Sequence, residues 1–471
     1  MARVETIVFL SLVLDLFAFT IPLPLFPRII EWYTVLCKSE KLRIQTASFL
    51  EHYNSSRLSA GSFYKPSVHS TKWDIVLLGG LMGSVFSTLQ FIVSPKIGSL
   101  SDRYGRKRIL LITMIGNILS AVLWLQSTTF ATYMLSRVVG GLSEGNVQLA
   151  IAILSDVTTP ANRSKALAHV GIAFAVCFCI GPPIGAYFAS RPLPSSISTF
   201  GLELNPYAVP AAITVVLLVL ETLFLIVALP ETRGKRMVPP VEKEKATNGA
   251  AEKPAKKASV EQRIKILNTL RMLHFLFLGV FSGVEFTLTF LTFDLFDWNN
   301  KQNGALIGSI GIVSALLQGG YVRRATSKIG EGVMARRGVS SCVVALVLLA
   351  LLPQFTSTQP TIAFRLLQGA AVCMAFTSAT VVNSLTAFAS LQCDENAVDP
   401  ITGKPKEHPQ LAKGKALGQF RSSGQLGRAI GPLLACASYW TFGPSITYSI
   451  SAVAMASLSI GMRSIAATKS T

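Results

Sequence analysis

Residues 95–108 read Pro-Lys-Ile-Gly-Ser-Leu-Ser-Asp-Arg-Tyr-Gly-Arg-Lys-Arg, and this stretch decides the fold. Apolar runs flank it on both sides, at residues 75–93 and 109–125. Its five basic side chains and one acidic side chain cannot lie in hydrocarbon, so we interpret it as a tight polar hairpin between two membrane spans. Gly98 and Gly105 allow close packing and a sharp turn, and Asp102 can face a helix N-terminus or a neighbouring arginine.

The composition is that of a multi-pass membrane protein. Of the 471 residues, 50% are hydrophobic and only 14% are charged, and the mean hydropathy is +0.49. A helix needs about 20 apolar residues to cross the ~30 Å hydrocarbon core of a bilayer. The chain has room for twelve such spans and the loops between them. We therefore predict an all-α membrane protein with twelve transmembrane helices.

Positive charge is distributed unevenly along the chain. The net charge is +19, and the bases gather in alternate loops, at residues 95–108, 156–165, 231–271, 323–337 and 391–415, whereas the short loops 127–131, 354–360 and 441–443 carry no charge. Basic loops stay on the cytosolic side of a membrane, so this pattern predicts cytosolic termini and argues against nucleic acid as a partner. Loop 28–72 is also basic although we place it outside, but the rule is weakest for long loops.

Two acceptor sequences for N-glycosylation test this topology. Asn54-Ser55-Ser56 lies in the predicted outer loop, where we expect glycosylation to be possible. Asn162-Arg163-Ser164 falls in a basic loop, where it should be inert. We expect the plasma membrane rather than an internal membrane.

The two halves of the chain repeat each other. Two patterns recur 228 residues later and two others 250 residues later: Leu89-Gln90 with Leu317-Gln318 and Arg137 with Arg365, then Lys165-Ala166-Leu167 with Lys415-Ala416-Leu417 and Gly181-Pro182 with Gly431-Pro432. We predict six-helix bundles at residues 1–233 and 271–471. Between them, residues 234–270 are rich in Lys, Glu, Ala and Pro and are predicted to form a cytosolic linker.

Ionisable side chains inside the predicted spans are the candidates for function. Each costs roughly 2.5–3.5 kcal/mol at mid-helix on insertion scales, so such residues tend to face a cavity or one another. As substrate or proton-coupling residues we expect Asp15, Arg137, Glu144, Glu285, Arg365, Arg421 and Arg428. Arg137 could instead pair permanently with a helix end. Asp15 could instead form a local hydrogen bond beside the prolines that follow it.

Spacing places some of these residues on common faces. Arg137 and Glu144 are seven residues apart, as are Arg421 and Arg428, so each pair should face one side of its helix. Glu285 could load a proton or form a fixed ion pair with one of the latter arginines. We favour the functional interpretation, because intramembrane charge is functional by default.

Motifs of enzymes are missing from the sequence. It contains no P-loop, no G-x-S-x-G elbow, no H-E-x-x-H helix and no Cys/His set with metal-ligand spacing. No stretch could hold a nucleotide-binding domain. We therefore expect no enzymatic activity, no cofactor and no metal site.

The hairpin that opens this section resembles the loop between helices 2 and 3 of the major facilitator superfamily. The shared order is Gly98-x-Leu100-x-Asp102-Arg103-x-Gly105-Arg106-Lys107. The resemblance implies two parallel-repeat six-helix bundles with a binding site between them near the midplane. It also implies a gating role for the loop through Gly98, Asp102, Arg103, Gly105 and Arg106.

Two further patterns are similar to motifs of that superfamily. Gly181-Pro182 with Gly185, and Gly431-Pro432 in the second half, resemble the antiporter motif. This resemblance implies a kink that packs against the partner half, and export rather than uptake. Arg137 matches an arginine that the superfamily associates with proton coupling, although the usual Gln is Gly140 here.

A narrower resemblance is to the animal tetracycline-transporter-like family, carried by Leu14-Asp15-Leu16, Gly79-Gly80-Leu81 and Ser282-Gly283 with Glu285-Phe286-Thr287, among other matches. It implies a proton-linked antiporter that exports organic anions by alternating access. The partners would be an organic anion, protons or a counter-anion, and the lipid bilayer. The alternatives are an uncoupled facilitator of small amphiphilic solutes and a non-transporting membrane scaffold with the same fold.

Overall fold

The computed structural model describes residues 4–22, 25, 29, 70–189, 207–233, 259–298, 300–393 and 408–463. Asn54, most of the predicted outer loop and residues 234–258 of the predicted linker lie outside these ranges. Within them every regular element is a helix and there is no strand. The all-α prediction is therefore confirmed.

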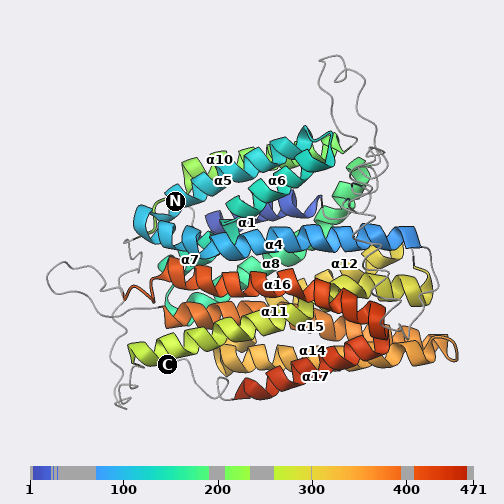
Figure 1. Ribbon diagram of the computed structural model, residues 1–471. Helices are drawn as coiled ribbons and strands as arrows, with labels where there is room; N and C mark the ends of the chain where they lie inside the picture. Colours follow the sequence, from blue (N-terminus) through green and yellow to red (C-terminus); the bar gives the residue numbers. More distant parts are fainter. Residues whose placement is uncertain are drawn as a thin grey trace, which may run out of the picture.

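The first half of the chain forms six rods from seven described helices (Figure 1). These are α1 (Val4–Thr20), α4 (Ser70–Tyr104), α5 (Arg106–Leu125), α6 (Phe130–Ser143), α7 (Asn146–Val157), α8 (Pro160–Ala189) and α10 (Ala208–Ala228). α6 and α7 form one rod that is interrupted at Glu144 and Gly145.

The second half forms six more rods. These are α11 (Val260–Phe296), α12 (Asn300–Leu317) with η2 (Gln318–Val322) and α13 (Arg323–Ile329), α14 (Glu331–Phe355), α15 (Pro360–Gln392), α16 (Lys413–Phe442) and α17 (Pro444–Gly461). The element η2 is a single π-helical turn inside the rod that begins with α12. Such turns often occur at functional sites.

The rods lie side by side, and the two halves meet along several helix pairs. Figure 1 shows α5, α6 and α10 at one side of the molecule and α14, α15 and α17 at the other. Between these groups α4 packs along α16 and α8 packs along α12. We call the end of the molecule at which α4 turns into α5 the basic end. α16 starts at this end, since its first turn contacts Asp102 near the end of α4.

Glycines form equivalent turns in the two halves. Gly105, between α4 and α5, has a φ of 105°, and Gly330, between α13 and α14, has a φ of 86°. Residues with a Cβ rarely adopt such a φ, so both turns favour glycine. A Cβ at Gly105 would also lie 2.6 Å from the Glu231 carboxylate.

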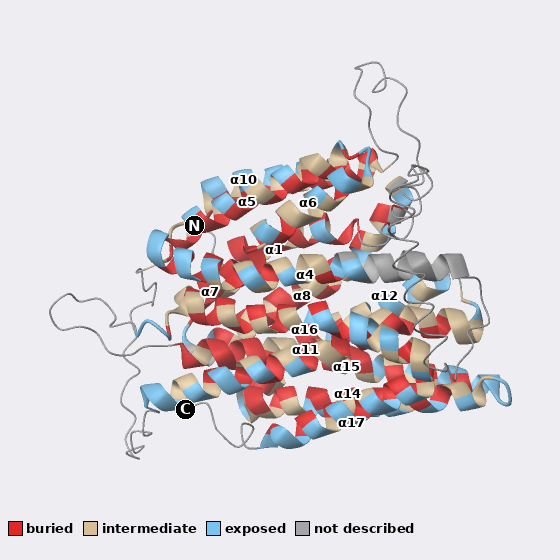
Figure 2. Cartoon of the chain, in the orientation of Figure 1, coloured by how far each residue is buried: buried red, intermediate tan, exposed pale blue. Residues whose placement is uncertain are grey.

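Apolar side chains are both buried between the rods and exposed on the outside (Figure 2). One buried cluster is built mainly from helices of the first half and another from helices of the second. On the outer face of α10, Val227 is 87% exposed, and Ile112, Ile115 and Val453 are exposed on other helices. Eight described helices are long and apolar enough to cross a membrane. This outer apolar surface is where lipid chains would lie.

One predicted boundary differs in the structure. The first helix of the second half begins at Val260, so residues 260–270 of the predicted linker are helical. The reason is a capping box, in which Ser259 and Gln262 satisfy each other's backbone amides and start the helix before the apolar run.

Candidate functional site

A cavity of about 370 Å³ lies between the two halves. Its walls come from α1, α4, α7 and α8 of the first half and from α11, α12, α15 and α16 of the second. Small-molecule sites typically measure roughly 300–1,000 Å³. Of the residues predicted to carry chemistry, the cavity is lined by Asp15, Glu144, Glu285, Arg421 and Arg428.

Two arginines of α16 face this cavity, as their spacing predicted. Arg428 is exposed and Arg421 is half-buried, and both line the cavity. Among the described residues, neither forms an ion pair within 4.0 Å. Their charges are therefore available to a ligand.

Glu285 of α11 is exposed and also lines the cavity. Its charge interacts with that of Arg428, but no ion pair within 4.0 Å joins Glu285 to Arg421 or Arg428. The fixed ion pair that was its alternative role is thus not formed in this conformation.

The break between α6 and α7 organises the carboxylates of the first half. Glu144 ends α6 and lines the cavity, and Asn146 begins α7. The Asn146 side chain donates a hydrogen bond of 2.6 Å to Asp15, which is 4% exposed. The partner of Asp15 is therefore on a distant helix, and the local hydrogen bond considered for it is not formed.

Four phenylalanines of the first half line the same cavity: Phe19 of α1, Phe86 of α4, and Phe174 and Phe178 of α8. The ring centroids of Phe19 and Phe86 are 6.3 Å apart, and those of Phe174 and Phe178 are 6.2 Å apart. Phe19 and Phe178 link these pairs at 6.3 Å. The rings form one aromatic wall of the cavity.

The structure places two predicted residues outside the cavity. Arg137 lies over aromatic rings, with its guanidinium carbon 5.4 Å from the ring centroid of Tyr133. Glu144, seven residues later at the end of the same helix, lines the cavity, whereas Arg137 does not. Arg365 is exposed near the start of α15, since that helix begins at Pro360. Arg137 and Arg365 are the two arginines that the 228-residue repeat relates.

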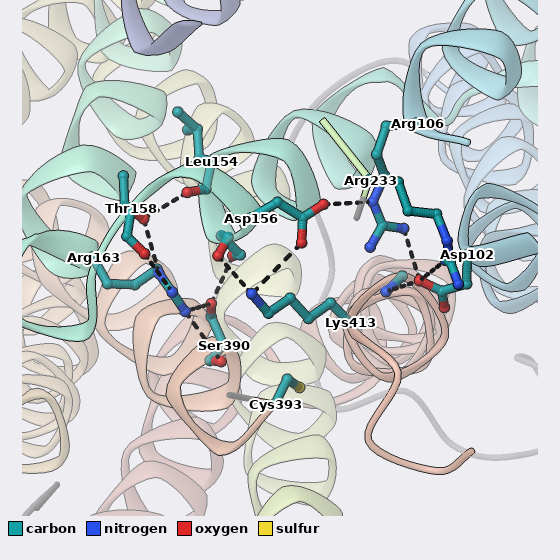
Figure 3. Close-up of polar contacts among 12 residues, drawn as sticks. Asp102, Arg106, Leu154, Asp156, Thr158, Arg163, Arg233, Ser390, Cys393 and Lys413 are labelled. Carbon is teal, nitrogen blue, oxygen red and sulfur yellow. Dashed lines mark hydrogen bonds and ion pairs between the residues drawn. The ribbon is translucent and has the colours of Figure 1, made fainter. Parts of the chain in front are cut away.

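Asp102 holds the start of α16 at the basic end (Figure 3). Its carboxylate accepts hydrogen bonds from the backbone amides of Gly414, at 2.9 Å, and Lys415, at 2.6 Å. Its Oδ1 atom also forms ion pairs with Arg106 at 2.8 Å and Arg233 at 3.2 Å. The contacts predicted for Asp102, to a helix N-terminus and to arginines, are present. We call these contacts the latch.

Arg106 extends the latch to a second acid. Its Nε atom lies 2.9 Å from Asp156 Oδ2. Asp156 in turn pairs with Lys413 of the second half at 3.6 Å. Figure 3 shows these side chains in one continuous chain of contacts. Sequence reasoning missed Asp156, although it is an acid at the start of a basic loop.

The other predicted residues of the hairpin differ in their roles. Gly98 allows close approach, since a Cβ there would lie 2.0 Å from the Gly414 carbonyl oxygen. Arg103 is exposed beside the ring of Tyr104 and takes no part in the latch. Glu231, which sequence reasoning did not select, accepts hydrogen bonds from the backbone amides of Arg106 and Lys107 at the start of α5.

The second half builds a counterpart of the latch from different residues. Glu331 directly follows the Gly330 turn, is buried, and accepts a hydrogen bond from Ser164 in the first turns of α8. Ser164 and Gly414 are 250 residues apart, the same offset as Lys165 and Lys415. The two halves are therefore joined at the basic end by two related contacts.

The Gly-Pro motifs pack within their own halves, which corrects the prediction that they face the partner half. A Cβ at Gly181 would lie 2.0 Å from Thr20 Oγ1, and one at Gly185 would lie 2.0 Å from the Ile21 carbonyl oxygen, so both glycines serve the contact of α8 with α1. Gly431 lies equally close to Gly279 of α11, and the helices continue through Pro182 and Pro432. The close approach itself is as predicted.

Sequence reasoning missed several polar residues of the cavity, among them Gln148 of α7, His274 of α11 and Gln318 of η2. For Gln318 a signal existed, because Leu89-Gln90 and Leu317-Gln318 are repeat partners and both glutamines line the cavity. Gln148 and His274 carried no comparable signal.

Sequence comparisons agree with this architecture. Residues 8–432 match the family model of the Major Facilitator Superfamily. The chain is 31% identical over 466 residues to the mouse protein called major facilitator superfamily domain-containing protein 10, which covers 95% of this chain and 90% of the relative. It is 26% identical over 272 residues to the class H tetracycline resistance protein of Pasteurella multocida, covering 58% of this chain and 63% of the relative.

Solved structures agree as well. The crystal structure of the human organic anion transporter MFSD10 (TETRAN) has a TM-score of 0.75 and 29% identity, covering 98% of this chain and 99% of that one. The proton:xylose symporter XylE has a TM-score of 0.64 at 14% identity, covering 99% of this chain and 96% of that one, and shows likeness of fold alone.

Proposed function

Because this chain belongs to the major facilitator superfamily, we propose that it is a secondary transporter that moves small organic anions through the central cavity by alternating access. Its similar proteins are transporters rather than enzymes, and one of them is named an organic anion transporter. The cavity between the two halves is the site at which the substrate would bind.

One observation carries the proposal: the cavity combines two arginines that have no ion-pair partner among the described residues with a wall of phenylalanines. A guanidinium group binds a carboxylate in bidentate geometry. Aromatic rings bind a flat apolar body by offset or edge contacts. Arg421 and Arg428 with Phe19, Phe86, Phe174 and Phe178 therefore suit an aryl carboxylate.

In this conformation the contacts of the latch hold the two halves together at the basic end, so we take the cavity to be closed there. The positive-inside rule places that end in the cytosol. Alternating access then requires the contacts of Asp102 with Gly414 and Lys415 to break, so that the cavity can open to the cytosol for loading. This cycle would export the anion, as the tetracycline resistance proteins among the relatives are named for resistance to a drug.

Coupling to protons follows from the carboxylates in the cavity. An entering anion competes with the Glu285 carboxylate for the charge of Arg428. A proton on Glu285 removes that competition and leaves the arginine to the anion. Asp15 and Glu144 lie within electrostatic reach of Arg421 and offer the same competition in the first half. Protonation of these carboxylates and binding of the anion therefore favour each other, which couples the movement of the anion to that of protons.

Transport of naproxen, an aryl carboxylate, into proteoliposomes tests this proposal. We expect a pH gradient across the membrane to drive accumulation of naproxen above its external concentration. Arg428→Ala should abolish this accumulation, whereas Arg365→Ala, an exposed arginine outside the cavity, should not. Flux that ignores the pH gradient would identify an uncoupled facilitator. Flux no greater than in protein-free liposomes would identify a scaffold and overturn the proposal.

A further inference from the structure

Three side chains that line the cavity contain a buried polar atom with no hydrogen-bond partner among the described residues. These atoms are Gln148 Oε1, His274 Nε2 and Gln318 Oε1. The three residues are only 3%, 4% and 4% exposed. A buried polar group without a partner is costly and calls for an explanation.

The orientations of two of these side chains are fixed by backbone carbonyls, which can only accept hydrogen bonds. The Gln148 Nε2 group donates to the Ser94 carbonyl at 3.1 Å, so its Oε1 atom is the one left over. His274 Nδ1 lies 3.0 Å from the Phe420 carbonyl and must carry the hydrogen, so Nε2 of the neutral ring is a bare acceptor.

The His274 ring is held rigidly in this position. It stacks on the ring of Phe420, with centroids 4.2 Å apart and an interplanar angle of 4°. Gly424 provides the space for it, since a Cβ there would lie 2.4 Å from His274 Cε1.

His274 lies close to the arginines of α16. Its ring packs against Gly424 and hydrogen-bonds to the Phe420 carbonyl, so it lies between Arg421 and Arg428 along that helix. Gln148 is hydrogen-bonded to Ser94, which packs against Gly418 of the same helix. The cavity thus combines cationic donors with unsatisfied acceptors.

We propose that the cavity selects organic anions that carry an O–H or N–H donor in addition to the carboxylate. The donor group binds His274 Nε2 or Gln148 Oε1, and the carboxylate binds Arg428. Gln318 Oε1 offers a third acceptor for a second donor. This inference rests on the proposed function and names the substrate class of the same site.

Two matched ligands test the inference: naproxen, which carries a methoxy group far from its carboxylate, and O-desmethylnaproxen, which has a hydroxyl there. Binding to purified protein is measured by calorimetry. We expect the wild-type protein to bind the hydroxyl compound about tenfold more tightly, since an unmet buried acceptor costs on the order of 1.4 kcal/mol. The double variant His274→Leu with Gln148→Leu should remove most of this preference.

His169→Leu provides the matched control, because His169 of α8 lies against Phe9 and does not line the cavity. It should keep the full preference. Equal affinity for the two ligands in the wild-type protein would overturn the inference and leave the proposed function standing. If neither ligand binds or is transported, the proposed function itself fails. The wild-type comparison needs no variant, so a misfolded variant cannot obscure the result.

Discussion

The carboxylate of Asp102 accepts a hydrogen bond of 2.6 Å from the backbone amide of Lys415, in the first turn of α16. The side chain comes from one half of the protein and the amide from the other. Free amides at a helix N-terminus attract anions, and a charged acceptor strengthens the bond. The contact therefore acts as a cap that one half supplies to the other, and it must break whenever the basic end opens.

Asp102→Asn should slow naproxen transport several-fold without lowering the amount of folded protein. The amide keeps the size of the carboxylate but loses its charge, which weakens both the cap and the ion pair with Arg106. Transport in proteoliposomes and size-exclusion chromatography of the same preparation measure the two effects. Arg103→Ala, which removes a charge outside the latch, is the control. A parallel loss of folded protein and activity would show that Asp102 is only structural.

Gly98→Ala should destabilise the closed basic end, because the added methyl group would overlap the Gly414 carbonyl. Gly83→Ala on the same helix meets no atom within 4 Å and should have little effect. We expect the melting temperature to fall for the first variant by several degrees more than for the second, as a loss of about 1–3 kcal/mol would cause. Equal melting temperatures would mean that α4 and α16 do not rely on this approach.

Arg428→Ala should weaken naproxen binding about tenfold or more, because a desolvated guanidinium–carboxylate pair is lost. Arg421→Ala should act in the same direction. Arg365→Ala removes an arginine that is exposed outside the cavity and should leave the affinity unchanged. Calorimetry on the three variants provides the comparison. Unchanged affinity in both cavity variants would contradict the assignment of the anion site.

Glu285→Gln should bind naproxen at every pH while losing its dependence on the pH gradient. The proposed competition makes binding to the native protein stronger at low pH, where Glu285 is protonated, and weaker as the carboxylate forms. Glutamine resembles the protonated form and cannot lose a proton. Binding titrations across pH, together with transport with and without a gradient, measure both properties. A pH dependence that survives in Glu285→Gln would assign the coupling to another group. Asp15 and Glu144, the other carboxylates of the cavity, would then be the candidates.

Glycosylation tests the orientation of the chain. Asn54→Gln should abolish the mobility shift that a glycosidase produces, whereas Asn162→Gln should leave it unchanged. The alternation of basic loops predicts that the first site lies outside the cytosol and the second inside. A shift that is lost with Asn162→Gln and kept with Asn54→Gln would show that the topology is the reverse of the predicted one.

Local sequence patterns predicted the parts of the site that depend on an unbroken helix or on a motif of closely spaced residues, such as the hairpin at residues 95–108. Arg421 and Arg428 face the cavity together because α16 runs without interruption between them. The same spacing did not place Arg137 in the cavity with Glu144, at which the helix ends. Gly145 and Asn146, which follow, are residue types that often interrupt helices, but the spacing argument did not use them.

The acceptors of the cavity could not be predicted, because their properties depend on contacts between distant helices. The free atom of Gln148 is Oε1 only because its amide group is used by Ser94, and Nε2 of His274 is bare only because of Phe420. A sequence shows that these residues are polar. It does not show which atom remains free after folding.

Two of the contacts that join the halves at the basic end differ in the kind of partner that the acid binds. Asp102 binds main-chain amides, but a Cβ at Gly414 would lie 2.3 Å from the Gly98 carbonyl oxygen and 2.7 Å from Asp102 Oδ1, so this contact requires glycine at that position. Glu331 binds the hydroxyl of Ser164, which most single substitutions delete. The acid lies three residues before its glycine at Asp102 and one residue after its glycine at Glu331. Both joints therefore depend on the identity of one small residue in the other half, Gly414 in the first case and Ser164 in the second.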